Sequence, residues 1–239
     1  MPAKQPTILA TSMGFNRARD PWQPSPVFQY AFDLAGTNRA RLCFISTGTG
    51  DRPDSIANFT SAFEGTDVQS SHLTLFDKPN VADIAEHLHQ QDVIWIDRGS
   101  LANLLAVWRV HKVDTILREC WERGVVLAGE SAGSLCWFSG GTTDSFGEVS
   151  VLNDGLALLP YSNAVHYSDR REQFQAAIKR DELPDGYATD AGAGLHFEGT
   201  QLVAAISDRA NAGAYHVKRT TRDEIEETPL PVERLKRSA

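Results

Sequence analysis

Short apolar runs alternate with amphipathic stretches along the first half of the chain. The runs have the length and the bounding polar or turn residues of buried strands. They cover residues 7–11, 41–46, 71–76, 93–96 and 125–128. Between several of them apolar residues recur at helical spacing, which predicts helices over 55–63, 81–89 and 101–123. Gly124 is a suitable stop for the last of these helices.

This alternation predicts an α/β fold. Right-handed crossovers between the strands give a mainly parallel sheet with helices on both faces, which is a three-layer α/β/α sandwich. After residue 149 the pattern changes, and short strands are expected at 186–190, 195–198, 202–207 and 213–217. We expect them to extend the same sheet in antiparallel fashion. No linker or repeat divides the chain, so we expect one domain over 1–239 with a charged, frayed tail from residue 220.

The composition limits which classes of protein this chain can belong to and which kinds of partner it can bind. The formal net charge is −8, and the basic residues are scattered except for a cluster at 234–237, so no nucleic-acid partner is expected. Cys43, Cys120 and Cys136 lie in apolar runs without CxxC spacing, which is typical of reduced, buried thiols. The apolar stretches are too short for a membrane span or a signal peptide. We therefore expect a cytoplasmic protein without a membrane partner.

The most informative segment is GVVLAGESAGSLCWF, residues 124–138. A buried strand leads into Gly-Glu-Ser-Ala-Gly and then into an expected apolar helix, which is the setting of the G-x-S-x-G nucleophile elbow. Glycine and alanine leave room for a tight strand-to-helix turn that exposes the serine. The segment predicts Ser131 as nucleophile and the amide of Ala132 as an oxyanion donor. A serine here could also merely cap the helix, but the strand before it and the small residues after it favour the nucleophile.

A serine hydroxyl becomes a good nucleophile only when a base removes its proton, so one of the seven histidines should serve it. His166 follows a short apolar strand and precedes polar residues, a position at which catalytic groups are often held. His196 and His216 alternate within expected late strands and are more typical of structural histidines. The sequence therefore predicts His166 as the general base.

Several ordered motifs accompany the elbow and cover nearly the whole chain. They are CFISTGTGD (43–51), DVIWID (92–97), VVLAGESAGSLCWF (125–138), GGTTDSFG (140–147), GLALLP (155–160), NAVHYSDRREQF (163–174) and GYATDAGAGLHFEG (186–199). Together they resemble the peptidase E and cyanophycinase family of serine peptidases. The fold of that family is related to the class I glutamine amidotransferases.

The resemblance implies hydrolysis of a short peptide after an acidic residue, typically an N-terminal aspartyl dipeptide, through an acyl-enzyme without metal or cofactor. Ser131 and His166 match the nucleophile and the base. Asp144 and Asp190 both match acidic positions from which a carboxylate would orient the imidazole, and we rank Asp144 first. Arg171 matches an arginine that binds the substrate carboxylate, although a solvated arginine in the first turn of a helix would look the same.

The chain departs from the family at the glycine-rich loop after the fourth strand, where an amide completes the oxyanion hole. Only Gly99 is retained, and Arg98 beside it could bind an acidic substrate. A second departure is Ala191, which follows Asp190 where many relatives carry a second acidic residue. Glu130 occupies a variable position, which indicates a residue that lines the pocket. These differences indicate altered substrate choice or lost activity.

Other functions therefore stay open. An amidase or esterase on the same scaffold would share the elbow, and a binding protein without catalysis would keep the pocket. A nucleotide site is disfavoured because STGTGD lacks the phosphate-loop pattern, and a metal hydrolase because no HExxH motif occurs. A homodimer is compatible with Trp108 and Trp121, which could serve a core or an interface.

Overall fold

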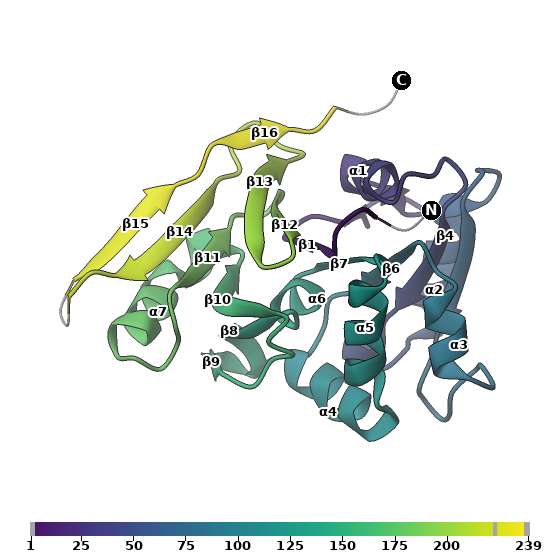
Figure 1. Ribbon diagram of the computed structural model, residues 1–239, viewed down its shortest axis with the longest axis horizontal. Coiled ribbons are helices and arrows are strands. Elements are labelled where there is room, and N and C mark those ends of the chain that lie inside the picture. Colours follow the sequence, from purple (N-terminus) through teal and green to yellow (C-terminus); the bar gives the residue numbers. More distant parts are fainter. Residues whose placement is uncertain (1–2, 222–223, 237–239) are drawn as a thin grey trace.

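A computed structural model describes residues 3–221 and 224–236 of the chain. Its larger sheet has eight strands (Figure 1). In spatial order they are β16 (Val232–Arg234), β13 (Gln201–Ser207), β12 (Ala193–Glu198), β1 (Thr7–Thr11), β7 (Val126–Glu130), β6 (Val93–Ile96), β4 (Arg41–Ile45) and β5 (Gln69–Leu73). The run from β1 to β5 is parallel throughout, because crossovers through helices join its strands.

Helices cover both faces of this sheet. One face packs against α1 (Pro26–Leu34) and α2 (Pro53–Phe63), and the other against α3 (Ile84–His89), α4 (Leu101–His111) and α5 (Val113–Glu122). Alternate side chains of β6 divide between the faces, with Trp95 in the first core and Ile94 in the second. The predicted three-layer α/β/α arrangement is confirmed. Within the described ranges, none of the helices combines the length and apolar character needed to cross a bilayer.

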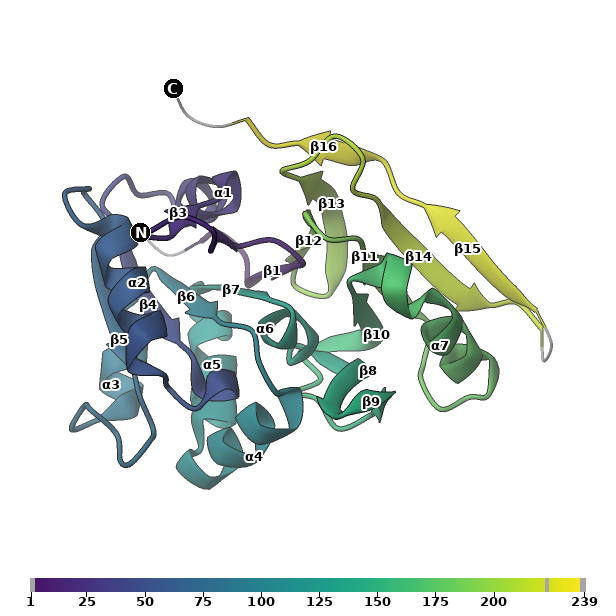
Figure 2. The same ribbon diagram turned by 180° about the vertical axis from the view of Figure 1, so that it is seen from behind.

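A second sheet of six strands lies beside the first, and both views show α7 (Tyr167–Lys179) against it (Figures 1 and 2). Its strands in spatial order are β15 (Ile225–Pro229), β14 (Ala214–Arg219), β11 (Gly186–Thr189), β10 (Leu159–Val165), β8 (Phe138–Phe146) and β9 (Glu148–Leu152). The short helix α6 (Ala132–Leu135) connects β7 of the larger sheet to β8 of the smaller one. A small hairpin of β2 (Phe15–Asn16) and β3 (Gln23–Pro24) precedes α1, and the 3₁₀ turn η1 (Thr47–Thr49) follows β4.

The four late strands do not all extend one sheet. β12 and β13 do so in antiparallel fashion, as predicted, but β11 and β14 belong to the smaller sheet. That part of the prediction is wrong, because alternation of apolar and polar residues identifies a strand without identifying its partner.

Two further expectations are corrected. The helix expected over 101–123 is broken at Lys112, which has a left-handed backbone (φ 58°) and separates α4 from α5. No glycine or proline marks that break in the sequence. The tail expected to fray from residue 220 contains β15, paired with β14, and β16, paired with β13. Its charged residues suit exposed edge strands, and residues 222–223 and 237–239 lie outside the described part.

Candidate active site

Ser131 lies between β7 and α6 in a strained conformation, with φ 58° and ψ −111°. Its amide donates to the carbonyl of Thr11 at 3.0 Å. Cβ atoms at Gly129 and Gly133 would clash with backbone atoms of Gly133 and Ile96 respectively, so only glycine permits this close approach. The strand-to-helix turn expected at this serine is therefore present. The helix after it is shorter than expected, because the chain enters β8 at residue 138.

The side chains of Ser131 and His166 line one cavity of about 520 Å³, and both residues are half-buried. The remaining lining residues are Ser12, Met13, Gly14, Phe15, Asn16, Arg17, Gln23, Pro24, Ser25, Arg98, Glu130, Ala191, Asp208 and Arg209. Between the two described side chains of Ser131 and His166 the structure shows no hydrogen bond. Catalytic hydrogen bonds often tighten only when substrate binds, so this arrangement is compatible with proton transfer.

His166 lies between β10 and α7, and its backbone is left-handed (φ 53°, ψ 49°). Its amide donates to the hydroxyl of Ser12 at 3.4 Å. Burial lowers the pKa of His166, the nearby charge of Arg170 lowers it further, and the carboxylates of Asp169 and Asp144 partly oppose both effects. The imidazole is therefore neutral around pH 7 and able to accept a proton.

Neither acid predicted to orient His166 accepts a hydrogen bond from it within the described residues. Asp144 lies on β8 with 59% of its side chain exposed, and it accepts from Arg170 at 2.9 Å. One oxygen of Asp190, Oδ2, accepts from the amide of Gly213 at 3.1 Å and from the hydroxyl of Tyr215 at 3.2 Å. The other oxygen, Oδ1, is buried and has no partner in the described part of the chain.

The loop after β6 brings a cation to the cavity. Arg98 is exposed, lines the cavity, and acts through its charge on both Glu130 and His166. It forms no ion pair with another described residue. Gly99 has a φ of 125°, and a Cβ there would clash with the backbone of Gly48, so this glycine packs against a neighbouring loop instead of lining the cavity. Ala132 is buried, and as the first residue of α6 its amide has no partner within the helix.

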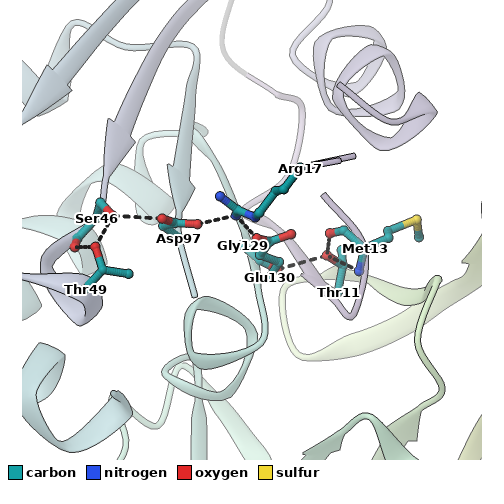
Figure 3. Close-up of polar contacts among 8 residues, drawn as sticks. All are labelled: Thr11, Met13, Arg17, Ser46, Thr49, Asp97, Gly129 and Glu130. Atoms are coloured by element: carbon teal, nitrogen blue, oxygen red, sulfur yellow. Dashed lines mark hydrogen bonds and ion pairs between the residues drawn. The ribbon is translucent and has the colours of Figure 1, made fainter. Parts of the chain in front are cut away.

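A buried charge cluster adjoins the cavity and was not predicted (Figure 3). The guanidinium of Arg17 bridges two carboxylates: it donates to Asp97 at 2.6 Å and also to Glu130. Asp97 is 1% exposed and also accepts from the hydroxyl of Ser46 at 2.8 Å. Burial raises the pKa of Glu130, while the charge of Arg17 opposes that rise. The guanidinium of Arg17 thus forms ion pairs with two buried carboxylates at the ends of neighbouring strands.

Part of this cluster could have been predicted from the sequence. Asp97 directly follows one predicted buried strand and Glu130 ends the next, and the carboxyl ends of parallel strands meet at one edge of a sheet. The role of Arg17 could not have been predicted, because this residue lies 80 residues before Asp97 in a segment without a clear hydrophobic period. Its guanidinium also covers the ring of Trp22 at 4.1 Å.

Arg171, the predicted ligand of a substrate carboxylate, is not brought to this cavity. It lies on α7 and donates to Glu227 of β15 at 2.6 Å. Its guanidinium lies 4.8 Å and 5.0 Å from the ring centres of Tyr167 and Tyr215. Among the described residues that line the cavity, Arg98 is the arginine that forms no ion pair with another described residue.

Comparison with known proteins places this geometry in context. The model of peptidase family S51 matches residues 9–205. The uncharacterized peptidase YgaJ of Bacillus subtilis (strain 168) is 41% identical over 210 residues, which cover 87% of this chain and 90% of the relative. A putative peptidase E from Listeria monocytogenes EGD-e has a similar fold, with a TM-score of 0.60 and 17% identity over 82% of this chain and 96% of that one. A peptidase from an acI-B1 Actinobacterium gives a TM-score of 0.59 and 14% identity over 94% and 96%.

Proposed function

This chain belongs to peptidase family S51 and is a serine-type peptidase, and from that premise we propose that it hydrolyses dipeptides that begin with an aspartyl residue. The observation that carries the proposal is the shared cavity, in which Ser131 at a strained strand-to-helix turn lies with His166. The acidic preference rests on the resemblance of the motifs and on the cation that Arg98 adds to the same cavity.

In the proposed reaction the imidazole of His166 takes the proton of the Ser131 hydroxyl, and Oγ attacks the scissile carbonyl carbon. Collapse of the tetrahedral adduct breaks the C–N bond, and His166 returns the proton to the departing amine. Water then attacks the acyl-enzyme, again with His166 as base, and releases the first residue and the free serine. The lowered pKa of His166 supports this role, because the base must be neutral at the start.

Two backbone amides are assigned to the oxyanion hole. The amide of Ala132 has no partner within α6, because it is the first residue of that helix, and it lies at the positive end of the first helical turn. The amide of Gly99 is the second candidate, and substrate binding would have to bring it toward the cavity, because its loop packs against Gly48.

Opposite charges in the cavity suit the two charged groups of an N-terminal aspartyl residue. The guanidinium of Arg98 would pair with the side-chain carboxylate. Arg17 donates to Oε1 of Glu130, and the other oxygen, Oε2, lies beside Gly14, which also lines the cavity. That oxygen would accept from the α-ammonium group.

The acid that orients His166 is assigned to Asp144, with Asp190 as the alternative. The negative charge of Asp144 raises the pKa of His166, which is the effect that an orienting carboxylate would have. Asp190 offers a buried oxygen without a partner among the described residues, and this favours it as the second candidate.

Hydrolysis of Asp–Leu and Asn–Leu by the full chain and by its Ser131→Ala variant tests the proposal. We expect hydrolysis of Asp–Leu to exceed that of Asn–Leu and to vanish in the variant. Turnover that survives the substitution would contradict the assigned nucleophile. Binding of Asp–Leu in calorimetry without hydrolysis would instead identify a binding protein that has lost catalysis.

A further inference from the structure

The hairpin of β14 and β15 lies outside residues 9–205, the segment that matches the family model. β14 pairs with β11, which in turn pairs with β10, the strand that leads into His166. Figure 2 shows β15 at the outer edge of this sheet beside α7. The hairpin is thus joined to the part of the fold that carries the candidate base.

Glu227 of β15 binds one face of α7 through three hydrogen bonds. Its carboxylate accepts from the hydroxyl of Tyr167 at 2.6 Å, from Arg171 at 2.6 Å and from the amide of Gln175 at 2.8 Å. These residues follow one another at intervals of four, so they lie on one side of the helix. The side chain of Glu227 is 18% exposed and that of Arg171 is 42% exposed, so the carboxylate that accepts these charge-assisted bonds is the better shielded partner.

Arg171 serves as the counter-ion within this group. Its guanidinium pairs with Glu227 and lies over the rings of Tyr167 and Tyr215. Such cation–π contacts stabilise the positive charge. Burial raises the pKa of Tyr167, and its hydrogen bond to Glu227 raises it further. Tyr167 therefore stays protonated at moderate pH, and its hydroxyl donates a hydrogen bond to Glu227.

Tyr167 directly follows His166 and is fully buried. The left-handed backbone of His166 is costly for a residue other than glycine, so its neighbours must hold it there. On one side its amide donates to Ser12, and on the other Tyr167 is anchored to Glu227. We propose that Glu227 is a positioning residue, which fixes the start of α7 and thereby directs the imidazole of His166 toward Ser131.

This inference rests on the proposed roles of Ser131 and His166. The variant Glu227→Gln removes the charge and leaves one acceptor oxygen for three donors. The matched control is Glu226→Gln, because Glu226 is its exposed neighbour on β15 and pairs with Lys218 at 2.9 Å. We expect kcat of Glu227→Gln to fall about tenfold with KM within about twofold, since the imidazole is misdirected while the substrate contacts remain. Glu226→Gln should match the wild type.

A second readout is independent of any peptide substrate. The rate at which a fluorophosphonate labels Ser131 should fall with kcat in Glu227→Gln and stay unchanged in Glu226→Gln. Tyr167→Phe, which removes one hydroxyl, should slow labelling in the same direction. Combined with Glu227→Gln it should add little, because both changes break the same bond.

The outcomes separate this inference from the proposed function. Wild-type protein that is not labelled at Ser131 contradicts the proposed function. Labelling of wild type together with unchanged labelling in Tyr167→Phe overturns the positioning role. A lower melting temperature of Glu227→Gln with unchanged kcat also overturns it, because the contact would then be purely structural. If Glu227→Gln does not fold, the result with Tyr167→Phe decides alone.

Discussion

Ser131 stands at the end of a strand in the larger sheet, and His166 at the end of a strand in the smaller one. The turn at Ser131 is formed by buried strand ends and by glycines that touch neighbouring backbone. The turn at His166 depends on polar side chains from distant parts of the sequence, Ser12 and, through Tyr167, Glu227. Close backbone packing is thus prominent around the candidate nucleophile, and side-chain hydrogen bonds are prominent around the candidate base.

Substitutions on the two sides of the cavity should therefore differ in whether they lower stability or activity. Replacing a glycine near Ser131 by a larger residue would disturb close packing and lower the free energy of unfolding. A polar-to-apolar change near His166 would leave the core intact and misdirect the imidazole. The smaller sheet is therefore the side on which activity and stability should separate.

The largest effect should follow loss of the imidazole itself. His166→Ala should lower kcat by roughly 10⁴-fold, because the variant lacks the imidazole that takes the serine proton in the proposed reaction. The comparison is His111→Ala, which changes a histidine at the end of α4 and should leave kcat unchanged. Steady-state kinetics with Asp–Leu measures both, and a His166→Ala variant within tenfold of wild type would remove this residue from the mechanism.

Next in size is the effect of Arg17 on the larger sheet. Arg17→Ala leaves Asp97 and Glu130 buried without their cation, and we expect a loss of about 3–5 kcal/mol in the free energy of unfolding. Arg209→Ala, on the same cavity but with 67% of its side chain exposed, should change that free energy by about 0.5 kcal/mol at most. Urea denaturation measures both variants. Equal free energies of unfolding for Arg17→Ala and the wild type would mean that Asp97 and Glu130 do not need the ion pair with Arg17.

Arg98→Gln should act on binding more than on chemistry. Loss of a charge-assisted pair with the substrate carboxylate should raise KM for Asp–Leu by about tenfold to a hundredfold. KM for Asn–Leu should hardly change, which makes the neutral peptide an internal control. An equal rise for both peptides would show that Arg98 does not read the carboxylate.

The smallest expected effect is on pH dependence. Because burial and Arg170 lower the pKa of His166, the base loses its function only when the pH falls below that lowered value. The acid limb of kcat/KM should therefore have its midpoint below about 6.5, the ordinary histidine pKa. Asp144→Asn removes a charge that raises this pKa, so it should move the midpoint lower still. A wild-type midpoint above 6.5 would contradict the described environment.

The sequence predicted the parts of the fold that depend on local patterns. The buried strands before Ser131, the turn at Gly129 and Gly133, and the helices on both faces follow from apolar period and small residues. The division of the late strands between two sheets did not follow, because pairing depends on which edge is free in three dimensions. The break at Lys112 carries no glycine or proline signal.

The same limit applies to the candidate site. Ser131, His166, Arg98 and Glu130 were identified as candidates, and the structure brings all four to one cavity. Arg171 resembled a ligand of the substrate carboxylate, but its counter-charge Glu227 lies 56 residues later on a strand that was expected to fray. Neighbouring residues cannot reveal such a pairing, and for this reason the sequence did not show that Arg171 lies outside this cavity.

The central claim is that the hydroxyl of Ser131 is activated by the imidazole of His166. It is tested most directly by treating the full chain with a fluorophosphonate at pH 7 and mapping the adduct by mass spectrometry, beside His166→Ala. A single adduct on Ser131, formed far more slowly in the variant, is the predicted result. An adduct on another residue, or equal rates in both proteins, would contradict it.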